Sequence, residues 1–193
     1  MLDYSLEAAR YDETRGGLPR ARAAAEAVRG LIPEPGTLLD LACGTGLVTR
    51  ELAARGLRVL GVDAAAGMAR LASERVPVVL GDGRRLPVRD RCVDAVTTFW
   101  LLHLLDDARP VIAEAARVLR PGGVFVTTVD KKAAHRPGDR SPATDGAEIV
   151  IAEAARRGLR LRGEPGTGRG VRGVPTRFSG CWPSPRSEPG FAS

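Results

Sequence analysis

Apolar runs and amphipathic stretches alternate along most of this chain of 193 residues. The apolar runs are short and rich in Val and Leu, and the stretches between them carry apolar residues at helical spacing. This alternation predicts an α/β fold with a doubly wound, mainly parallel sheet and helices on both of its faces. The predicted strands are residues 37–41, 58–62, 76–82, 93–100 and 124–129, and the helices between them are 46–55, 65–74 and a stretch whose apolar face is Ala108, Val111, Ile112, Ala115, Val118 and Leu119.

Two further helices are predicted outside this core. Residues 17–31 are rich in Ala and end near a Gly, and residues 145–157 begin with Asp145 as N-cap and Glu148 three residues later. Beyond them the periodicity is lost, because 13 of the 38 residues from 156 to 193 are Pro or Gly. Such a composition buries too little apolar surface to offset the entropy of ordering, so we expect a disordered tail over 163–193. The alternative is that "VRGVPTRFSGCW" folds back and closes the exposed edge of the sheet, with Val174, Phe178 and Trp182 at four-residue intervals.

The distribution of charge argues against nucleic acid as a partner. The chain carries a net charge of +6, but residues 1–155 contain 21 basic and 21 acidic side chains, so the excess lies in the tail. The body of the protein therefore lacks the basic face of a dedicated nucleic-acid binder. An aromatic content of 4% also disfavours a groove that stacks bases.

Cysteine, histidine and hydropathy patterns give no sign of a metal or a membrane. Cys43, Cys92 and Cys181 lack paired spacing, and His103 and His135 are the only histidines. No apolar run approaches the roughly 18 to 20 residues of a membrane span, and the N-terminus does not have the pattern of a signal peptide. We expect a cytoplasmic protein that needs no metal, and the sequence leaves a homo-oligomer open.

The stretch "LLDLACGTG", residues 38–46, predicts a ligand-binding turn between a strand and a helix. Gly44 and Gly46 would lie at the carboxyl edge of the sheet, where open α/β sheets bind ligands. Asp63 and Asp82 end the next two predicted strands at the same edge, and a carboxylate there can accept both hydroxyl protons of a ribose. This arrangement predicts a nucleoside ligand. The alternatives are that the glycines only form a tight turn and that Asp63 and Asp82 are exposed loop residues without a ligand.

A phosphate-bearing cofactor is disfavoured by the same stretch. "GTGLVT" has Thr49 where a dinucleotide site has its third Gly, and the chain has no GxxxxGK[ST] phosphate loop. A nicotinamide oxidoreductase remains an alternative only because it shares the order of strand, Gly-rich turn, helix and acid.

Five segments carry a resemblance to a known family. "LLDLACGTG", "LGVDAAAGM", "GDGRRLPVRDRCVDAV", "LLHLLDD" and "EAARVLRPGGVFV" follow one another between about residues 35 and 130. In order and spacing they resemble the class I S-adenosylmethionine-dependent methyltransferases, in particular the small bacterial type similar to the ubiquinone and menaquinone methyltransferases. The resemblance implies a Rossmann-like fold with an N-terminal helical lid over residues 1–34 and an S-adenosylmethionine-binding domain over residues 35–162.

The same resemblance implies roles for individual residues. Asp40 and the backbone of Ala42, Cys43 and Gly44 would hold the methionine part of the cofactor. Asp63 would take the ribose hydroxyls, Ala64 and Met68 would pack on the adenine, and Asp82 and the Gly83 backbone would meet its polar edge. Phe99 would line the methionine end through its carbonyl, and Tyr11 would lie in the lid.

Two departures from the family affect the substrate side and the sheet. The segment between Lys131 and Asp145 is short for a family that places substrate-covering helices there. The closing pair of strands after the last helix is expected to be incomplete, since "GLRLRGEPGTGRG" offers only one weak strand.

The expected activity is methyl transfer to an O, N or C nucleophile of a small molecule. Alignment and exclusion of water can supply roughly 7 to 11 kcal/mol of such a barrier, so a dedicated base is optional. His103 is the candidate base, with a purely packing role as its alternative. A second reading of the whole chain is a truncated or degenerate domain that binds the cofactor without turnover.

Overall fold

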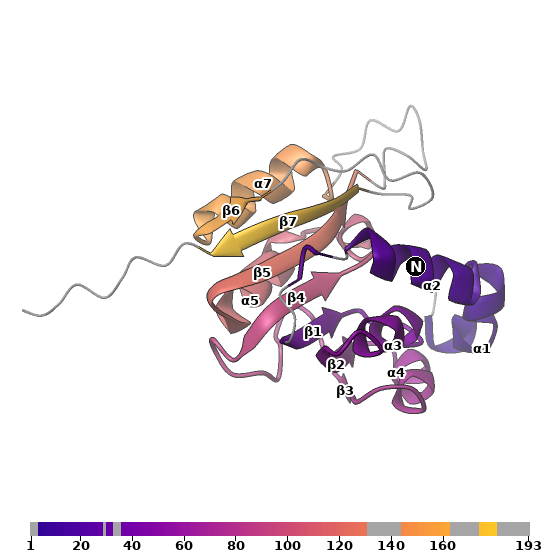
Figure 1. Ribbon diagram of the computed structural model, residues 1–193. Helices are drawn as coiled ribbons and strands as arrows, with labels where there is room; N and C mark the ends of the chain where they lie inside the picture. The colour runs from indigo at the N-terminus through magenta and orange to yellow at the C-terminus, as the bar shows by residue number, and fades with distance from the viewer. Residues whose placement is uncertain (1–3, 29, 33–35, 131–143, 163–173, 181–193) are drawn as a thin grey trace, which may run out of the picture.

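The computed structural model describes residues 4–28, 30–32, 36–130, 144–162 and 174–180, which form a single sheet flanked by helices (Figure 1). Seven strands run in the order β3-β2-β1-β4-β5-β7-β6. The first five strands in this order run parallel to one another, and β7 is antiparallel to both β5 and β6. The strands are β1 Thr37–Leu41, β2 Arg58–Asp63, β3 Val78–Leu80, β4 Val93–Thr98, β5 Leu119–Val129, β6 Leu159–Leu161 and β7 Val174–Gly180.

The helices follow the strands as the apolar pattern predicts, and a helical pair precedes the sheet. The arrowheads of β1 and β4 point toward this pair, α1 and α2, so the N-terminal segment lies at the carboxyl edge of the sheet (Figure 1). The helices are α1 Tyr4–Thr14, α2 Gly17–Ala27, α3 Leu47–Ala53, α4 Ala66–Ser73, α5 Arg109–Val118 and α7 Ala147–Arg156, with a short 3-10 helix η1 at Leu102–Leu104.

Alternation along the strands divides the core between the two faces of the sheet. In β1, Leu38 packs in a cluster with α2 and α3 residues such as Val28 and Leu52. Its neighbour Leu39 belongs to the opposite cluster with Ile112 of α5 and Val150 of α7. Successive side chains of a strand point to opposite faces, so these clusters confirm the doubly wound arrangement that the pattern predicts.

The N-cap predicted for the last helix is wrong. α7 begins at Ala147 after Gly146, which makes no side-chain capping bond. The free Ala147 N–H instead donates to the Asp130 carboxylate at 2.9 Å, and the Asp130 N–H donates to the Asp145 carbonyl at 2.8 Å. An acid at the end of β5 thus caps the helix from a distance in sequence, which local patterns do not reveal.

The closing strands differ from the expected incomplete pair. Residues 174–180, which we predicted as disordered, form β7 between β5 and β6, with Val174 opposite Val129 and Ser179 opposite Val124. Pairing with two neighbours at once stabilises this segment despite its weak local strand signal. The rest of the predicted tail, 163–173 and 181–193 with Cys181, lies outside the described residues, as does His135.

Candidate functional site

The Gly-rich turn between β1 and α3 is built from residues in left-handed conformations. Ala42 has φ of 55°, Gly44 of 59° and Gly46 of 78°. A Cβ on Gly46 would lie 3.1 Å from the Ala72 Cβ, so this Gly lets α3 approach α4. A Cβ on Gly44 would meet nothing within 4 Å. Gly46 therefore serves packing, whereas Gly44 borders open space at the edge of the sheet.

Asp63, the last residue of β2, ties that turn to the next strand. Its carboxylate accepts the Gly44 N–H at 2.8 Å and the Ala65 N–H at 2.9 Å, and the residue is 8% exposed. Burial raises the pKa of this carboxyl, while the backbone donors oppose the rise. Each carboxylate oxygen keeps a further acceptor direction beyond the one that the backbone uses.

Asp40 lies deeper, on β1, and is 2% exposed. The hydroxyls of Thr49 on α3 and Thr97 on β4 donate to its two oxygens at 2.6 and 2.8 Å. Burial raises the pKa of Asp40 to about 6, the two hydroxyls lower it, and the charge of Asp63 raises it further. A cation placed beside Asp40 would offset this cost of charge, and the ammonium of an amino acid is such a cation.

The backbone donors of the turn are mostly engaged within the protein. The Cys43 N–H donates to the Val62 carbonyl at 3.2 Å, and the Gly44 N–H donates to Asp63. The Cys43 thiol packs against Gly61, where a Cβ would lie 2.7 Å from the sulfur, and burial raises its pKa well above the usual range. The side chain of Cys43 therefore contributes to packing.

The predicted adenine residues lie at the ends of β2 and β3. Asp82 follows β3 and forms a double contact with Arg84, whose Nε and terminal nitrogen lie 3.0 and 2.7 Å from its oxygens. This contact lowers the pKa of Asp82. A Cβ on Gly83 would lie 3.7 Å from Val111 and 4.0 Å from Leu101, so its backbone runs close to apolar side chains.

Ala64 and Met68 differ in their exposure to solvent. Ala64 is exposed, whereas Met68 on α4 is 2% exposed and belongs to the core. The ring of Tyr11 lies 6.3 Å from the ring of Tyr4 within α1. His103 lies in η1, at the same carboxyl edge of the sheet as the end of β4.

A three-residue contact joins α1 to the Gly-rich turn, and sequence analysis did not find it. The Thr45 hydroxyl donates to one oxygen of Asp12 at 2.5 Å, and Arg75 lies 2.9 Å from the other. Arg75 also donates to the Thr45 carbonyl at 2.7 Å. We call Asp12, Thr45 and Arg75 the clasp. Nothing in the local pattern of these residues signals a contact over such distances in the chain.

A second contact joins α2 to the end of β4. The Arg20 guanidinium lies 3.6 Å from the centre of the Trp100 ring, and the rings of Phe99 and Trp100 are 5.9 Å apart. Trp100 has φ of 57°, a conformation that costs energy for a bulky residue, and its N–H donates to the Thr128 hydroxyl at 2.9 Å. The sequence assigned Phe99 to the methionine end of the cofactor, but it gave no sign of the contact between Arg20 and Trp100.

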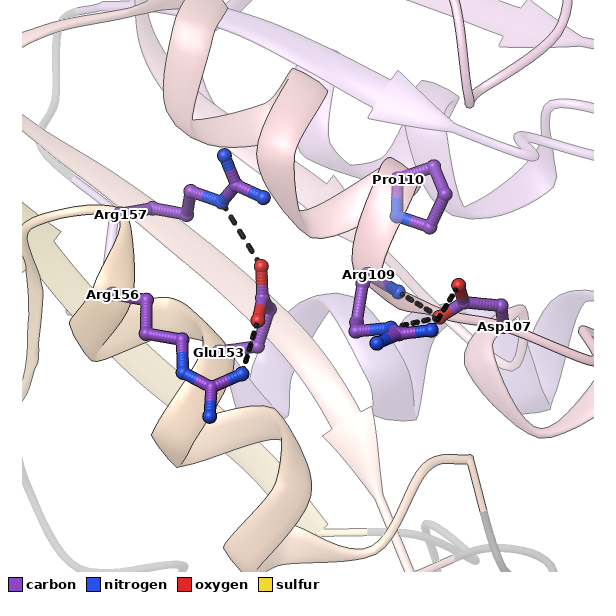
Figure 2. Close-up of a pocket in the computed structure, with 6 residues that line it drawn as sticks. All are labelled: Asp107, Arg109, Pro110, Glu153, Arg156 and Arg157. Atoms are coloured by element: carbon purple, nitrogen blue, oxygen red, sulfur yellow. Dashed lines mark hydrogen bonds and ion pairs between the residues drawn. The ribbon is translucent and has the colours of Figure 1, made fainter.

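A surface depression elsewhere does not coincide with this site. It has a volume of about 450 Å³ and lies between the start of α5 and the C-terminal half of α7. Figure 2 shows Glu153 between Arg156 and Arg157, with Arg109 held by Asp107. None of the residues predicted to bind the cofactor lines it, and the geometry of the Gly-rich turn, not this depression, defines the candidate site.

The described residues offer neither a metal cluster nor a membrane-spanning helix. No group of three or more His, Cys, Asp or Glu side chains within the described ranges is arranged to hold a metal ion. No helix in the described part of the chain is both long and apolar enough to cross a membrane.

Comparisons with known proteins agree with this geometry. Residues 39–127 match a family model described as "Methyltransferase domain". The chain is 43% identical over 95 residues to the demethylmenaquinone methyltransferase of Corynebacterium kroppenstedtii, covering 48% of this chain and 42% of that protein. It is 37% identical over 126 residues to an uncharacterized methyltransferase of Mycobacterium tuberculosis, covering 63% of this chain and 49% of that one. The chain thus spans less than half the length of these curated relatives.

Solved structures show the same fold. A chain of the Haloferax volcanii complex between a methyltransferase and the Trm112 methyltransferase activator has a TM-score of 0.75, at 19% identity and covering 94% of this chain and 100% of that one. An S-adenosylmethionine-dependent methyltransferase from Mesorhizobium loti has a TM-score of 0.67, at 19% identity and covering 81% and 97% of the two chains.

Proposed function

The chain belongs to the class I S-adenosylmethionine-dependent methyltransferase family, and from this membership we propose that it transfers a methyl group to a small-molecule acceptor. S-adenosylmethionine is the cofactor of this family. The observation that carries the proposal is the pair of buried carboxylates, Asp40 and Asp63, beside a Gly whose missing side chain leaves open space. The acceptor atom, O, N or C, is part of the proposal.

The residues at the carboxyl edge fit the polar groups of this cofactor. Asp63 has acceptor directions left for two ribose hydroxyls after its two backbone contacts. Asp40 gains from a nearby ammonium because its own charge is costly in the core. Gly44 leaves room for the methionine chain that a Cβ would occupy. The Cys43 and Gly44 N–H groups are already used, so we propose that this part of the turn contributes shape and carbonyls.

The adenine end of the proposal rests on Asp82, Gly83, Ala64 and Met68. Asp82 is half-buried and shares its charge with Arg84, so an adenine amino group would compete with that guanidinium or take a free acceptor direction. Met68 contributes through the wall of the core rather than through an exposed face. Phe99 follows β4 directly and lies beside the methionine end of the proposed site.

The chemistry asks little of the protein beyond placement. The bound cofactor supplies an electrophilic methyl group. This chain then has to hold the acceptor in line, exclude water and accept or disperse any proton of the nucleophile. We propose that α1 and α2 form the lid that excludes water and that His103 is within reach of the acceptor as a base; a packing role remains the alternative for His103.

The identity of the acceptor is the finest part of the proposal. Relatives are named for demethylmenaquinone, and we propose a small unsaturated metabolite for this chain on that basis. Because the chain spans 42% of the length of one such relative, a domain that binds the cofactor without turnover is the second candidate.

One experiment separates the two candidates. The full chain is titrated calorimetrically with S-adenosylmethionine and with S-adenosylhomocysteine, and is then incubated with methyl-labelled cofactor and an extract of small metabolites. Binding together with a labelled product supports the methyltransferase. Binding without any labelled product supports the second candidate, and absence of binding contradicts both.

A further inference from the structure

The contact between Arg20 and Trp100 lies at the carboxyl edge of the sheet, next to the end of β4. Trp100 follows β4, whose carboxyl end adjoins that of β1 and the Gly-rich turn. Arg20 comes from α2, at the same edge of the sheet (Figure 1). The ring of Phe99 completes an aromatic wall beside them. We call Arg20, Phe99 and Trp100 the platform.

The guanidinium of Arg20 is half-buried and has no carboxylate partner among the described residues. One terminal nitrogen donates to the Arg15 carbonyl at 3.0 Å, and its flat face lies on the indole. Burial lowers the pKa of Arg20, while Tyr11 beside it raises that pKa. Asp12 of α1 is engaged in the clasp. A partly buried guanidinium without a carboxylate partner is stabilised further when an anion joins it.

The backbone conformation of Trp100 indicates that the surrounding structure fixes the platform in place. Its φ of 57° is unfavourable for a bulky side chain, and the bond from its N–H to Thr128, which is 2% exposed, fixes it. Strain of this type persists where the surrounding structure overrides it and concentrates at functional sites. The indole ring of Trp100 is therefore fixed in place, and the guanidinium carbon of Arg20 lies 3.6 Å from its centre.

We propose that the platform binds the anionic oxygen of a planar, unsaturated acceptor, with Arg20 as the residue that recognises the negative charge. This inference rests on the proposed function and names the class of its substrate. A guanidinium stacked on a ring presents its N–H edge sideways, which suits a planar oxyanion lying in the same plane. The anion is a ring carboxylate or a phenolate, which share this chemistry.

The charge of the platform also complements the rest of the site. Asp40 places negative charge where the ammonium of the cofactor would lie, and Arg20 places positive charge on the acceptor side. A phenolate held by Arg20 would already be deprotonated when it meets the methyl group. Its oxygen lone pair would form the new bond to carbon, while the carbon–sulfur bond breaks and its electron pair stays on sulfur.

The test uses binding of a charged probe and its neutral counterpart to the full chain. 2-Naphthoate and 2-naphthamide are titrated calorimetrically, with and without saturating S-adenosylhomocysteine. We expect at least tenfold tighter binding of the naphthoate, and loss of that preference in Arg20→Gln. Arg22→Gln on the same helix is the matched control, since Arg22 is exposed and pairs with Glu51 at 3.5 Å, and it should keep the preference.

Further arms separate the two anions and guard against misfolding. 4-Nitrophenol is titrated above and below its own pKa, and tighter binding of the ionised form identifies a phenolate site. Arg20→Lys keeps the charge without the planar fork, and it should retain part of the preference at an unchanged unfolding temperature. Equal affinity of the wild type for both naphthalene probes, or a preference that survives in Arg20→Gln, overturns the proposal. Failure to bind S-adenosylhomocysteine contradicts the proposed function instead, and the arm without it still decides the role of Arg20.

Discussion

At the scale of single residues, the two buried carboxylates of the site share one environment but have different partners. Asp63 accepts two backbone N–H groups, whereas Asp40 accepts two hydroxyls that can reorient. Fixed backbone donors can only donate and favour the charged form, whereas the hydroxyls, which also lower the pKa of Asp40, can rotate to accept a proton from its neutral form. Asp63 is therefore suited to a permanent acceptor role, and Asp40 to a charge that responds to its ligand.

Asp63→Ala is expected to weaken S-adenosylmethionine binding at least tenfold, about 1.4 kcal/mol, while the fold survives. The change removes the proposed acceptor of two ribose hydroxyls and also the bond from the Gly44 N–H. Calorimetric titration measures the affinity, and circular dichroism checks the fold. Asp107→Ala, in an exposed loop contact with Arg109, is the control and should bind normally. Unchanged affinity in Asp63→Ala would remove Asp63 from the site.

Asp40 predicts a pH dependence of stability. Its pKa is raised from 3.8 to about 6 in the folded state, so the neutral form favours folding. The contribution is fully present below pH 4 and is lost as the pH rises through 6, by up to ~3 kcal/mol. Denaturant titrations of the cofactor-free protein between pH 4 and 8 measure the loss. Asp40→Asn should remove this part of the profile, and an identical profile in the variant would contradict the assignment.

At the scale of elements, the strands and helices that local patterns specify are the ones that sequence predicts. β1 leads into the Gly-rich turn, β2 ends in Asp63 and β4 ends in Thr98, and most residues of β1 and β4 are buried, as in strands covered on both faces. β7 was predicted only as the alternative to a disordered tail, because Pro175 and Gly180 weaken its local signal and its stability comes from pairing with β5. Asp63 and Gly44 could be predicted as site residues because each follows or ends a strand in the sequence. The clasp and the contact of Arg20 with Trp100 could not be predicted, because only tertiary packing brings these residues together.

The role of Gly44 in the Gly-rich turn can be tested by comparison with Gly56, a second Gly at positive φ outside the turn. Gly44→Ala and Gly56→Ala both place a Cβ at positive φ, 59° and 91°, where neither would meet an atom within 4 Å. Each should cost about 1–2 kcal/mol of folding free energy for the left-handed backbone. Only Gly44→Ala should also lose cofactor affinity, by at least tenfold. Equal affinities of the two variants would show that the open space beside Gly44 is not the methionine path.

The clasp predicts that α1 controls release of the cofactor. Asp12→Asn weakens the ion pair with Arg75 and the bond from Thr45, so α1 should detach more often. We expect faster dissociation of S-adenosylhomocysteine in stopped-flow fluorescence and faster tryptic cleavage within residues 4–28. Glu13→Gln, exposed on the same helix, should behave as wild type. Dissociation at the wild-type rate in Asp12→Asn would show that α1 does not close the site.

At the scale of the whole molecule, the last described strand completes the sheet. β7 pairs with β5 over six residues and with β6 over three, so this one strand forms backbone hydrogen bonds with a neighbour on each side. An uncovered edge invites pairing with another chain. We had expected a dispensable tail, but the pairing of β7 makes at least residues 174–180 part of the folded unit.

Removal of residues 174–193 is therefore expected to lower the unfolding temperature and to promote self-association. The cause is the exposed edge of β5, which loses its antiparallel neighbour. Calorimetric scans and light scattering measure the two effects. Removal of residues 181–193 alone keeps β7 and is the matched control. A monodisperse protein with an unchanged unfolding temperature after the longer deletion would contradict the role of β7.

The placement of β7 also sets the order in which the chain can fold during its synthesis. β5 ends at Val129, but its antiparallel neighbour begins only at Val174, after α7 and β6 have been made. At about 5–20 residues per second, a ribosome needs several seconds to cover that interval. Throughout this interval β5 is paired only with β4 and its other edge is open, so the nascent chain completes the Gly-rich turn long before its last strand closes the sheet.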